Sequence, residues 1–192
     1  MKAYLDNAAT TAVDPLVVGA MLPYFTSRFG NPSSVHQWGQ SAGKALDQAR
    51  EAIAAFFRAE TEEIIFTSGA TESINLSHKG LIEALIKKYN LKTRPHIITT
   101  AIEHKAVLEA CRHLQNNNLA EVTYLPVSKT GLIDLETLAK AVTEQTVLIS
   151  VMYVNNEVGT VEPVKEIGDL VKTIKQERRK IIENELGIEF IK

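Results

Sequence analysis

Apolar, β-branched runs alternate with helical patterns along most of this chain. The strand candidates are short and are bounded by polar or turn-forming residues: Glu63–Thr67, His96–Thr100, Glu121–Pro126 and Val147–Val151. Segments with apolar residues at helical spacing separate them. Such alternation is typical of βαβ units, in which helices join parallel strands and cover the sheet. The pattern therefore predicts an α/β fold with a mostly parallel sheet and flanking helices.

Helical spacing places the expected helices between and around these strands. The predicted segments are Gly39–Phe57, Thr71–Tyr89, a helix after Glu103 that stops at the Asn116–Asn118 run, Asp134–Val142, and a helix that begins near Pro163 and carries Ile167, Leu170, Val171 and Ile174. The residues up to Pro15 are expected to form an arm of small residues with a turn at its end. Leu186–Lys192 is expected to form a turn and the start of a strand.

Composition narrows the classes of function. The chain has 192 residues, 45% hydrophobic and 23% charged, with a formal net charge of −2, as in ordinary globular proteins. No long basic run predicts a nucleic-acid partner or an anionic membrane surface. The single cysteine, Cys111, excludes an intramolecular disulfide framework and a multi-thiolate metal site, so no metal is expected. The sequence shows neither a signal peptide nor a membrane-spanning stretch, and we expect a cytoplasmic protein.

The stretch FTSGATESIN, Phe66–Asn75, leads from an expected strand into an expected helix. The first turn of a helix offers unpaired N–H groups and the positive end of the helix dipole, which together suit a phosphate. Gly69 is expected to adopt a backbone conformation closed to other residues and to let a ligand approach closely, and Ser68 and Thr71 can add hydroxyl donors. Alternatively, Thr71 is only an N-cap and Glu72 only a first-turn carboxylate.

Two further polar clusters follow expected strands. Glu103-His104-Lys105 comes after the second strand, and Asn155-Asn156-Glu157 comes after the fourth. The carboxyl ends of parallel strands meet at the edge of the sheet where ligands bind. Taken singly, His104 could be a capping histidine and Asn155 a turn residue. Together with Thr71, they predict a pocket for a phosphorylated aromatic ring, which an imidazole can stack on and a carboxamide can hydrogen-bond.

Seven stretches of the sequence resemble motifs of one protein family. They appear in the same order as in that family and cover nearly the whole chain up to about Gly168. They are YLDNAATT (Tyr4–Thr11), FGNPSSVHQWG (Phe29–Gly39), FTSGATESIN, IEHKAV (Ile102–Val107), VTYLPV (Val122–Val127), GLIDLETL (Gly131–Leu138) and VNNEVGTVEPV (Val154–Val164). The chain resembles the cysteine desulfurases, in the class V aminotransferase branch of the pyridoxal 5′-phosphate (PLP) enzymes. This resemblance implies the large domain of a fold type I transferase, incomplete in residues 16–192, with residues 1–15 as an arm belonging to the small domain.

The resemblance also implies roles for individual residues. Ala70 and Thr71 would hold the phosphate of PLP, His104 would stack over the ring and act catalytically in proton transfer, and Asn155 would contact the ring oxygen. The implied reaction removes sulfur from L-cysteine to give alanine and an enzyme persulfide for iron–sulfur cluster or thio-cofactor biosynthesis. The alternatives to this function are another class V enzyme, such as a selenocysteine lyase or an aminotransferase, or a non-catalytic partner of an intact desulfurase.

Several groups that the family needs have no counterpart in these residues. They are the lysine that attaches the cofactor covalently, the acidic residue and glutamine at the ring, the arginine that binds the substrate carboxylate, and the persulfide cysteine. Cys111, on the apolar face of a helix, is interpreted as a structural thiol. We therefore expect the amino-terminal half of a desulfurase, inactive alone, which forms a homodimer or pairs with a full-length desulfurase or with the other half.

Overall fold

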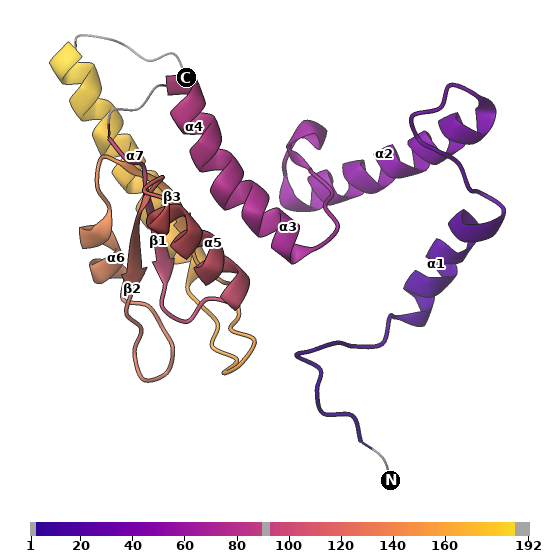
Figure 1. Cartoon of the computed structure of the whole chain (residues 1–192), viewed down its shortest axis with the longest axis horizontal. Coiled ribbons are helices and arrows are strands. Elements are labelled where there is room, and N and C mark those ends of the chain that lie inside the picture. Colours follow the sequence, from indigo (N-terminus) through magenta and orange to yellow (C-terminus); the bar gives the residue numbers. More distant parts are fainter. Residues whose placement is uncertain (1–2, 90–92, 187–192) are drawn as a thin grey trace. The chain divides into compact units, whose positions relative to one another are not determined.

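The computed structural model describes residues 3–89 and 93–186 (Figure 1). Its elements are α1 (Pro15–Thr26), α2 (Gln37–Phe57), η1 (Thr61–Glu63), α3 (Ala70–Asn75), η2 (Leu76–Gly80), α4 (Leu81–Tyr89), β1 (His96–Thr100), α5 (Lys105–Asn116), β2 (Glu121–Leu125), α6 (Leu135–Ala141), β3 (Thr146–Ser150) and α7 (Val164–Leu186). They form two compact units, Met1–Thr67 and Ser68–Lys192. The assignment of residues 1–15 to a separate small domain stays a prediction.

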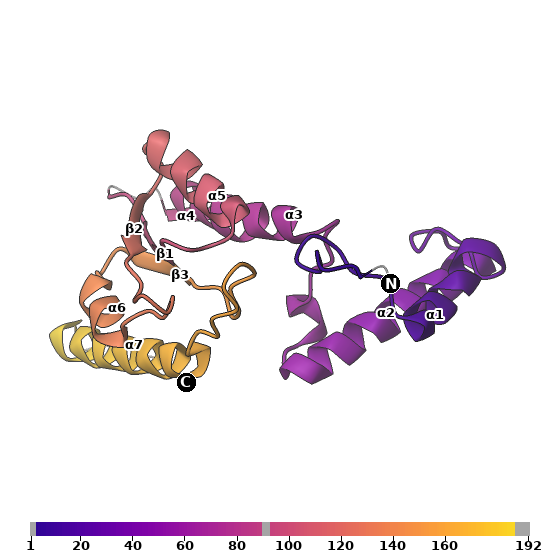
Figure 2. The ribbon, with the colours of Figure 1, turned by 90° about the horizontal axis from the view of Figure 1, so that it is seen from below.

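The second unit is built on a parallel sheet with the strand order β2-β1-β3. β1 pairs in parallel with both neighbours, from His96↔Glu121 to Thr100↔Leu125 on one side and as far as Thr99↔Ser150 on the other. Helices α4 and α5 cover one face of this sheet, and α6 and α7 cover the other (Figure 2). The α/β class with a parallel sheet is thereby confirmed.

Each face of the sheet has its own apolar core. Ile97 of β1 faces α4 and α5, where it packs with Ile82, Val107, Cys111 and Leu114. The next residue along β1, Ile98, faces the other way because side chains alternate along a strand. That second core consists of Ile98, Leu125, Ile133, Leu138 and Ile167. Burial on both faces explains why every residue of β1 is buried and why Ile97 and Ile98 stand next to each other instead of alternating with exposed polar residues.

The helices of this unit largely follow the sequence pattern. The expected helix Thr71–Tyr89 is continuous helical backbone from α3 to α4, with the π-helical turn η2 between them. α5 ends at Asn116, inside the asparagine run, where Asn118 takes a left-handed conformation with φ of 54°. The strand start expected toward Lys192 falls on residues 187–192, outside the described part of the chain.

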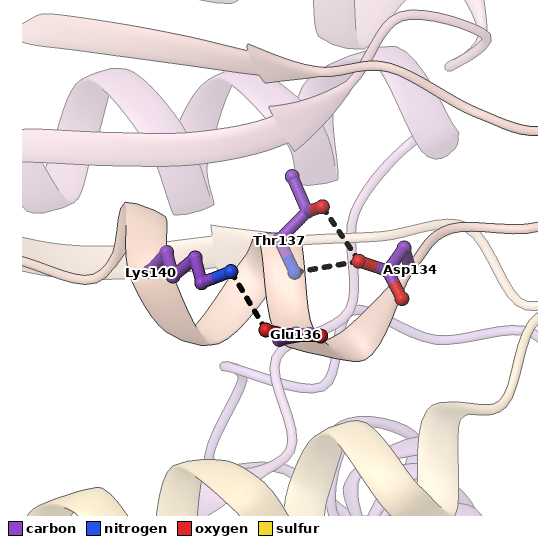
Figure 3. A network of polar contacts seen from close by, with 4 residues as sticks. All are labelled: Asp134, Glu136, Thr137 and Lys140. Atoms are coloured by element: carbon purple, nitrogen blue, oxygen red, sulfur yellow. Dashed lines mark hydrogen bonds and ion pairs between the residues drawn. The ribbon is translucent and has the colours of Figure 1, made fainter.

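The short helix α6 begins at a hydrogen-bonded N-cap. One Asp134 carboxylate oxygen accepts the backbone N–H and the hydroxyl of Thr137, at 2.8 and 2.6 Å (Figure 3). One turn further on, Lys140 forms an exposed ion pair with Glu136 at 2.7 Å. The Thr137 bonds lower the pKa of Asp134, because they favour its charged form. Asp134 thus fixes where α6 starts, and this places Leu138 in the core.

The first unit contains α1, α2 and η1. The turn signal at Asp14-Pro15 is the start of helix α1, which the sequence analysis missed: Asp14 accepts the N–H of Leu16, and Pro15 occupies the first helical position. At the start of α2, a Cβ on Gly39 would lie 2.2 Å from the carbonyl oxygen of Ser34, so only glycine fits there.

One predicted strand is wrong. Residues 64–67 of the expected strand Glu63–Thr67 form no regular structure, and Glu63 ends η1. Ile65 is 66% exposed and Phe66 44% exposed. A strand requires a neighbouring strand to pair with, and the sheet in the described residues, with the order β2-β1-β3, does not extend to this segment. The carbonyl of Ile64 instead accepts from the Arg50 guanidinium.

Candidate functional site at the carboxyl rim of the sheet

The loops that follow β1 and β3 leave the sheet side by side, because these parallel strands are neighbours. Glu103 lies in the first loop and is buried, at 7% exposure. Its Oε1 accepts the hydroxyl of Thr100 at 3.0 Å and the backbone N–H of Met152, in the second loop, at 2.8 Å. Burial raises the pKa of Glu103, the two hydrogen bonds oppose this shift, and nearby Glu162 adds to it.

Asn155 anchors the loop after β3 and is 4% exposed. Its Oδ1 accepts the backbone N–H groups of Glu157 and Val158, at 2.9 and 3.0 Å. Its Nδ2 donates to the carbonyl of Ile102, in the loop after β1, at 2.9 Å, and lies 3.2 Å from the sulfur of Met152. A ligand oxygen could therefore take the second Nδ2 proton only by replacing the thioether, which is a weak acceptor.

His104 is the N-cap of α5. Its Nδ1 accepts the backbone N–H of Ala106 at 3.1 Å, so the neutral ring carries its proton on Nε2. The capping role that the sequence left open is therefore present. The ring is exposed and its orientation is fixed through Nδ1, which leaves a face that can stack on a flat ligand.

The corner at Ser68–Thr71 already holds an oxyanion. Glu72 reaches back so that its Oε2 accepts the N–H of Ser68 at 2.7 Å and the hydroxyl of Ser68 at 2.6 Å, and these bonds lower its pKa. Ala70 and Thr71 are exposed at the first turn of α3, where the first intrahelical bond runs from Ser73 to Gly69. Their N–H groups thus precede the hydrogen-bonded ladder and remain available to an anion.

The expectation for Gly69 needs a correction. Its φ of 162° is extended backbone that any residue can adopt, so the glycine is not required by its conformation. A Cβ at this position would meet nothing within 4 Å. The open space is consistent with a close approach of a ligand, but the sterics do not demand glycine.

The structure brings together the loops that carry two of the predicted site residues. Asn155 contacts Ile102, two residues before His104, so both side chains belong to one rim. Thr71 is connected less closely, through the packing of α3 against α5. No hydrogen bond joins Thr71 to His104 or Asn155 within 3–89 and 93–186. In their chemistry, the donors at Ala70 and Thr71 suit a phosphate, the exposed imidazole suits an aromatic ring, and the rim carboxamide suits a ring oxygen.

Sequence reasoning missed two buried carboxylates. Glu103 stood in a cluster that drew attention to His104 alone. Glu162 is 2% exposed, and its Oε2 accepts the N–H of Ile133 at 3.2 Å, while its Oε1 has no partner within the described residues. In the sequence, Glu103 only follows an apolar strand and Glu162 only precedes a proline. Neither position indicates that the carboxylate is buried.

A parallel sheet between two helical layers defines an α/β protein, a class in which ligands commonly bind at the carboxyl rim of the sheet. The chain belongs to the aminotransferase class-V family, whose sequence pattern matches residues 3–177. It is 53% identical over 170 residues to the cysteine desulfurase IscS of Rickettsia africae (strain ESF-5), covering 88% of this chain.

Solved structures give the same result. A NifS-like protein superposes with a TM-score of 0.82 at 43% identity, covering 90% of this chain and 46% of that one. SspA in complex with cysteine superposes with a TM-score of 0.82 at 39% identity, covering 91% and 48%. The chain spans about 40% of the length of the IscS relative that it matches.

Two further features concern residues 3–89 and 93–186. None of their helices has both the length and the apolar character that a membrane crossing requires. Nor do His, Cys, Asp and Glu side chains gather there in groups of three or more that could hold a metal ion.

Proposed function

We propose that this chain is the PLP-binding part of a cysteine desulfurase. The observation that carries the proposal is the hydrogen bond from Asn155 to the carbonyl of Ile102, because it holds the Asn155 and His104 loops at one rim. The similarity to IscS over most of the chain supports the same reading. A cytoplasmic location is part of the proposal.

The chain's own residues would divide the work of binding PLP. The N–H groups of Ala70 and Thr71, with the Thr71 hydroxyl, would bind the phosphate at the positive end of the helix that starts there. His104 would stack on the ring, and Asn155 would donate to the ring oxygen in place of the Met152 sulfur. When bound, PLP withdraws electrons from the substrate carbon skeleton. In the neutral ring His104 Nε2 carries the proton, which it could donate to the substrate.

The proposed substrate is L-cysteine, from which the complete enzyme would transfer sulfur to an enzyme thiol. Its sulfur would then serve iron–sulfur cluster or thio-cofactor biosynthesis. SspA, one of the structural relatives, was solved in complex with cysteine. Cys111 does not supply the transfer thiol, because it is fully buried and its pKa is raised to about 11. The catalytic activity therefore requires a further segment that carries the attachment lysine and the transfer cysteine.

The second unit has a surface that such a segment could cover. β3 is the last strand of the order β2-β1-β3, so its outer backbone groups face no strand in the described chain. Beside it, an apolar groove of about 910 Å³ runs between β3 and α7, with Leu148, Ile149, Ile167 and Val171 in its walls. A complementary desulfurase segment would add a strand to this edge.

Titration of the purified chain with PLP tests the proposal. We expect saturable, reversible binding, seen in the absorbance of the free aldehyde, and no lysine adduct after borohydride reduction. Sulfide and alanine should form from L-cysteine only after the complementary segment of a desulfurase is added. A chain that does not bind PLP would contradict the proposed function.

A further inference from the structure

Two hydrogen bonds join the loops after β1 and β3, and the loop after β3 donates both of them. From the first loop, the Glu103 carboxylate accepts the backbone N–H of Met152 at 2.8 Å. From the second loop, the Asn155 carboxamide donates to the backbone carbonyl of Ile102 at 2.9 Å. In each case a buried side chain of one loop binds the backbone of the other. We call this pair of bonds the rim clasp.

The rim clasp begins where the backbone pairing stops. The β1–β3 ladder ends at Thr99↔Ser150, and the Thr99 hydroxyl adds a bond to the Ser150 carbonyl at 3.0 Å. Beyond this point the two loops share no ladder, and irregular backbone without such support opens readily. The rim clasp therefore holds the two loops side by side beyond the end of the β1–β3 ladder, and these loops contain His104 and Asn155.

We propose that Glu103 is a positioning residue, which sets the spacing between His104 and Asn155 by binding the loop after β3. The proposal rests on the proposed function for its purpose, since that spacing would fit the cofactor ring. Glu103 is adjacent to His104, and its partner Met152 lies three residues before Asn155. A shift of the Met152 backbone would thus move both the carboxamide and the sulfur that contacts it.

The two hydrogen bonds to Glu103 require a hydrogen-bond acceptor at that position, but they do not require a negative charge. One oxygen of Glu103, Oε1, accepts both hydrogen bonds, from the hydroxyl of Thr100 and from the backbone N–H of Met152. Burial disfavours the charged form of Glu103 and raises its pKa. A glutamine places a carbonyl oxygen where Oε1 lies, so Glu103→Gln should keep the rim clasp. Glu103→Met fills a similar volume without any comparable acceptor and should release it.

Hydrogen exchange of the whole chain without cofactor tests the clasp itself. We expect E103M to exchange about tenfold faster in the segments 101–106 and 151–158, as follows from losing one hydrogen bond, while the strands β1 and β2 keep their protection. E103Q should stay within about twofold of the parent chain, since it keeps the acceptor. Glu109→Met, on the exposed face of α5, is the matched control and should change neither segment.

Unchanged exchange at 151–158 in E103M would overturn the proposal. So would loss of protection throughout the sheet in both E103M and Glu103→Ala, because Glu103 would then be a general stability residue. Failure of E103Q to restore protection would also contradict it.

PLP titration of the same variants separates this inference from the proposed function. We expect the Kd for PLP to rise about tenfold in E103M and to stay within about twofold in E103Q and E109M. If the parent chain binds no PLP, the proposed function fails, and the exchange result alone decides whether Glu103 holds the loops. If the parent binds and E103M binds equally well, the positioning role fails while the proposed function stands.

Discussion

His96 and Thr146 lie 2.8 Å apart, Nδ1 to Oγ1, across the neighbouring strands β1 and β3. The other ring nitrogen of His96, Nε2, lies 2.8 Å from Oγ1 of Thr123 on β2. One buried imidazole therefore connects all three strands near their amino ends, opposite the rim that carries the candidate site. The two hydroxyls can each donate or accept, so they suit a neutral ring with one proton.

This arrangement predicts a loss of stability in mild acid. Burial lowers the pKa of His96 from its usual 6.5, although the carboxylate of Glu121 opposes the shift. The unfolded chain then binds more protons than the folded chain, so the free energy of unfolding falls as the pH drops below about 6.5. Urea unfolding followed by circular dichroism, at about pH 7.5 and about pH 5.5, should show this loss, and His96→Gln should reduce it.

His78 contributes with the same sign, because burial also lowers its pKa. The His96→Gln variant should therefore keep part of the pH dependence. His113→Gln, on the exposed side of α5, serves as the control and should behave as the parent chain does. An equal loss in the parent and in His96→Gln would show that His96 does not titrate on unfolding.

Cys111 should be nearly inert in the folded chain. It is fully buried, and burial together with the charge of Glu103 raises its pKa to about 11. At about pH 8 only about one thiol in a thousand would be ionised, and access is blocked as well. Reaction with a disulfide reagent should be slow in buffer and at least about a hundredfold faster in denaturant. Fast, complete labelling of the folded chain would contradict this burial.

The core of the second unit offers a matched pair of leucines. Leu138 of α6 is 0% exposed, whereas Leu132 is 40% exposed. Leu138→Ala would leave a cavity between α6 and the sheet and should lower the free energy of unfolding by about 2–5 kcal/mol. Leu132→Ala should cost less than about 1 kcal/mol. Chemical denaturation of both variants gives the comparison, and similar costs would mean that the second core is not closed at Leu138.

The sequence predicted the sheet well where both faces of a strand are buried. Ile97 and Ile98 pack into different cores, so β1 needs two adjacent apolar residues. Leu148 and Ile149 of β3 are divided between the two cores in the same way. The segment around Ile65 shows the opposite case. Its apolar pattern indicates a preference for burial, but not whether a neighbouring strand is available. A pattern of residues carries no information about hydrogen-bonding partners.

The site was predictable only in part for a similar reason. Polar residues after β1 and β3 indicated the carboxyl rim, since parallel strands end together there. The bond between Glu103 and Met152 joins residues 49 positions apart, and no local spacing predicts such a pair. The N-cap role of His104 could be foreseen, whereas its stacking on a ring stays a prediction.

Thr71 offers the most direct test of the phosphate site. Its exposed side chain lies in the first turn of α3, beside N–H groups that precede the helical ladder. A hydroxyl that donates to a charged phosphate contributes about 1.5–3 kcal/mol, so Thr71→Val should weaken PLP binding about 10- to 100-fold. Thr71→Ser keeps the hydroxyl and should bind nearly as the parent does. Because valine has the shape of threonine, the hydroxyl is the main difference between the variants. Equal Kd values for PLP in all three chains, measured by titration at constant pH, would place the phosphate elsewhere.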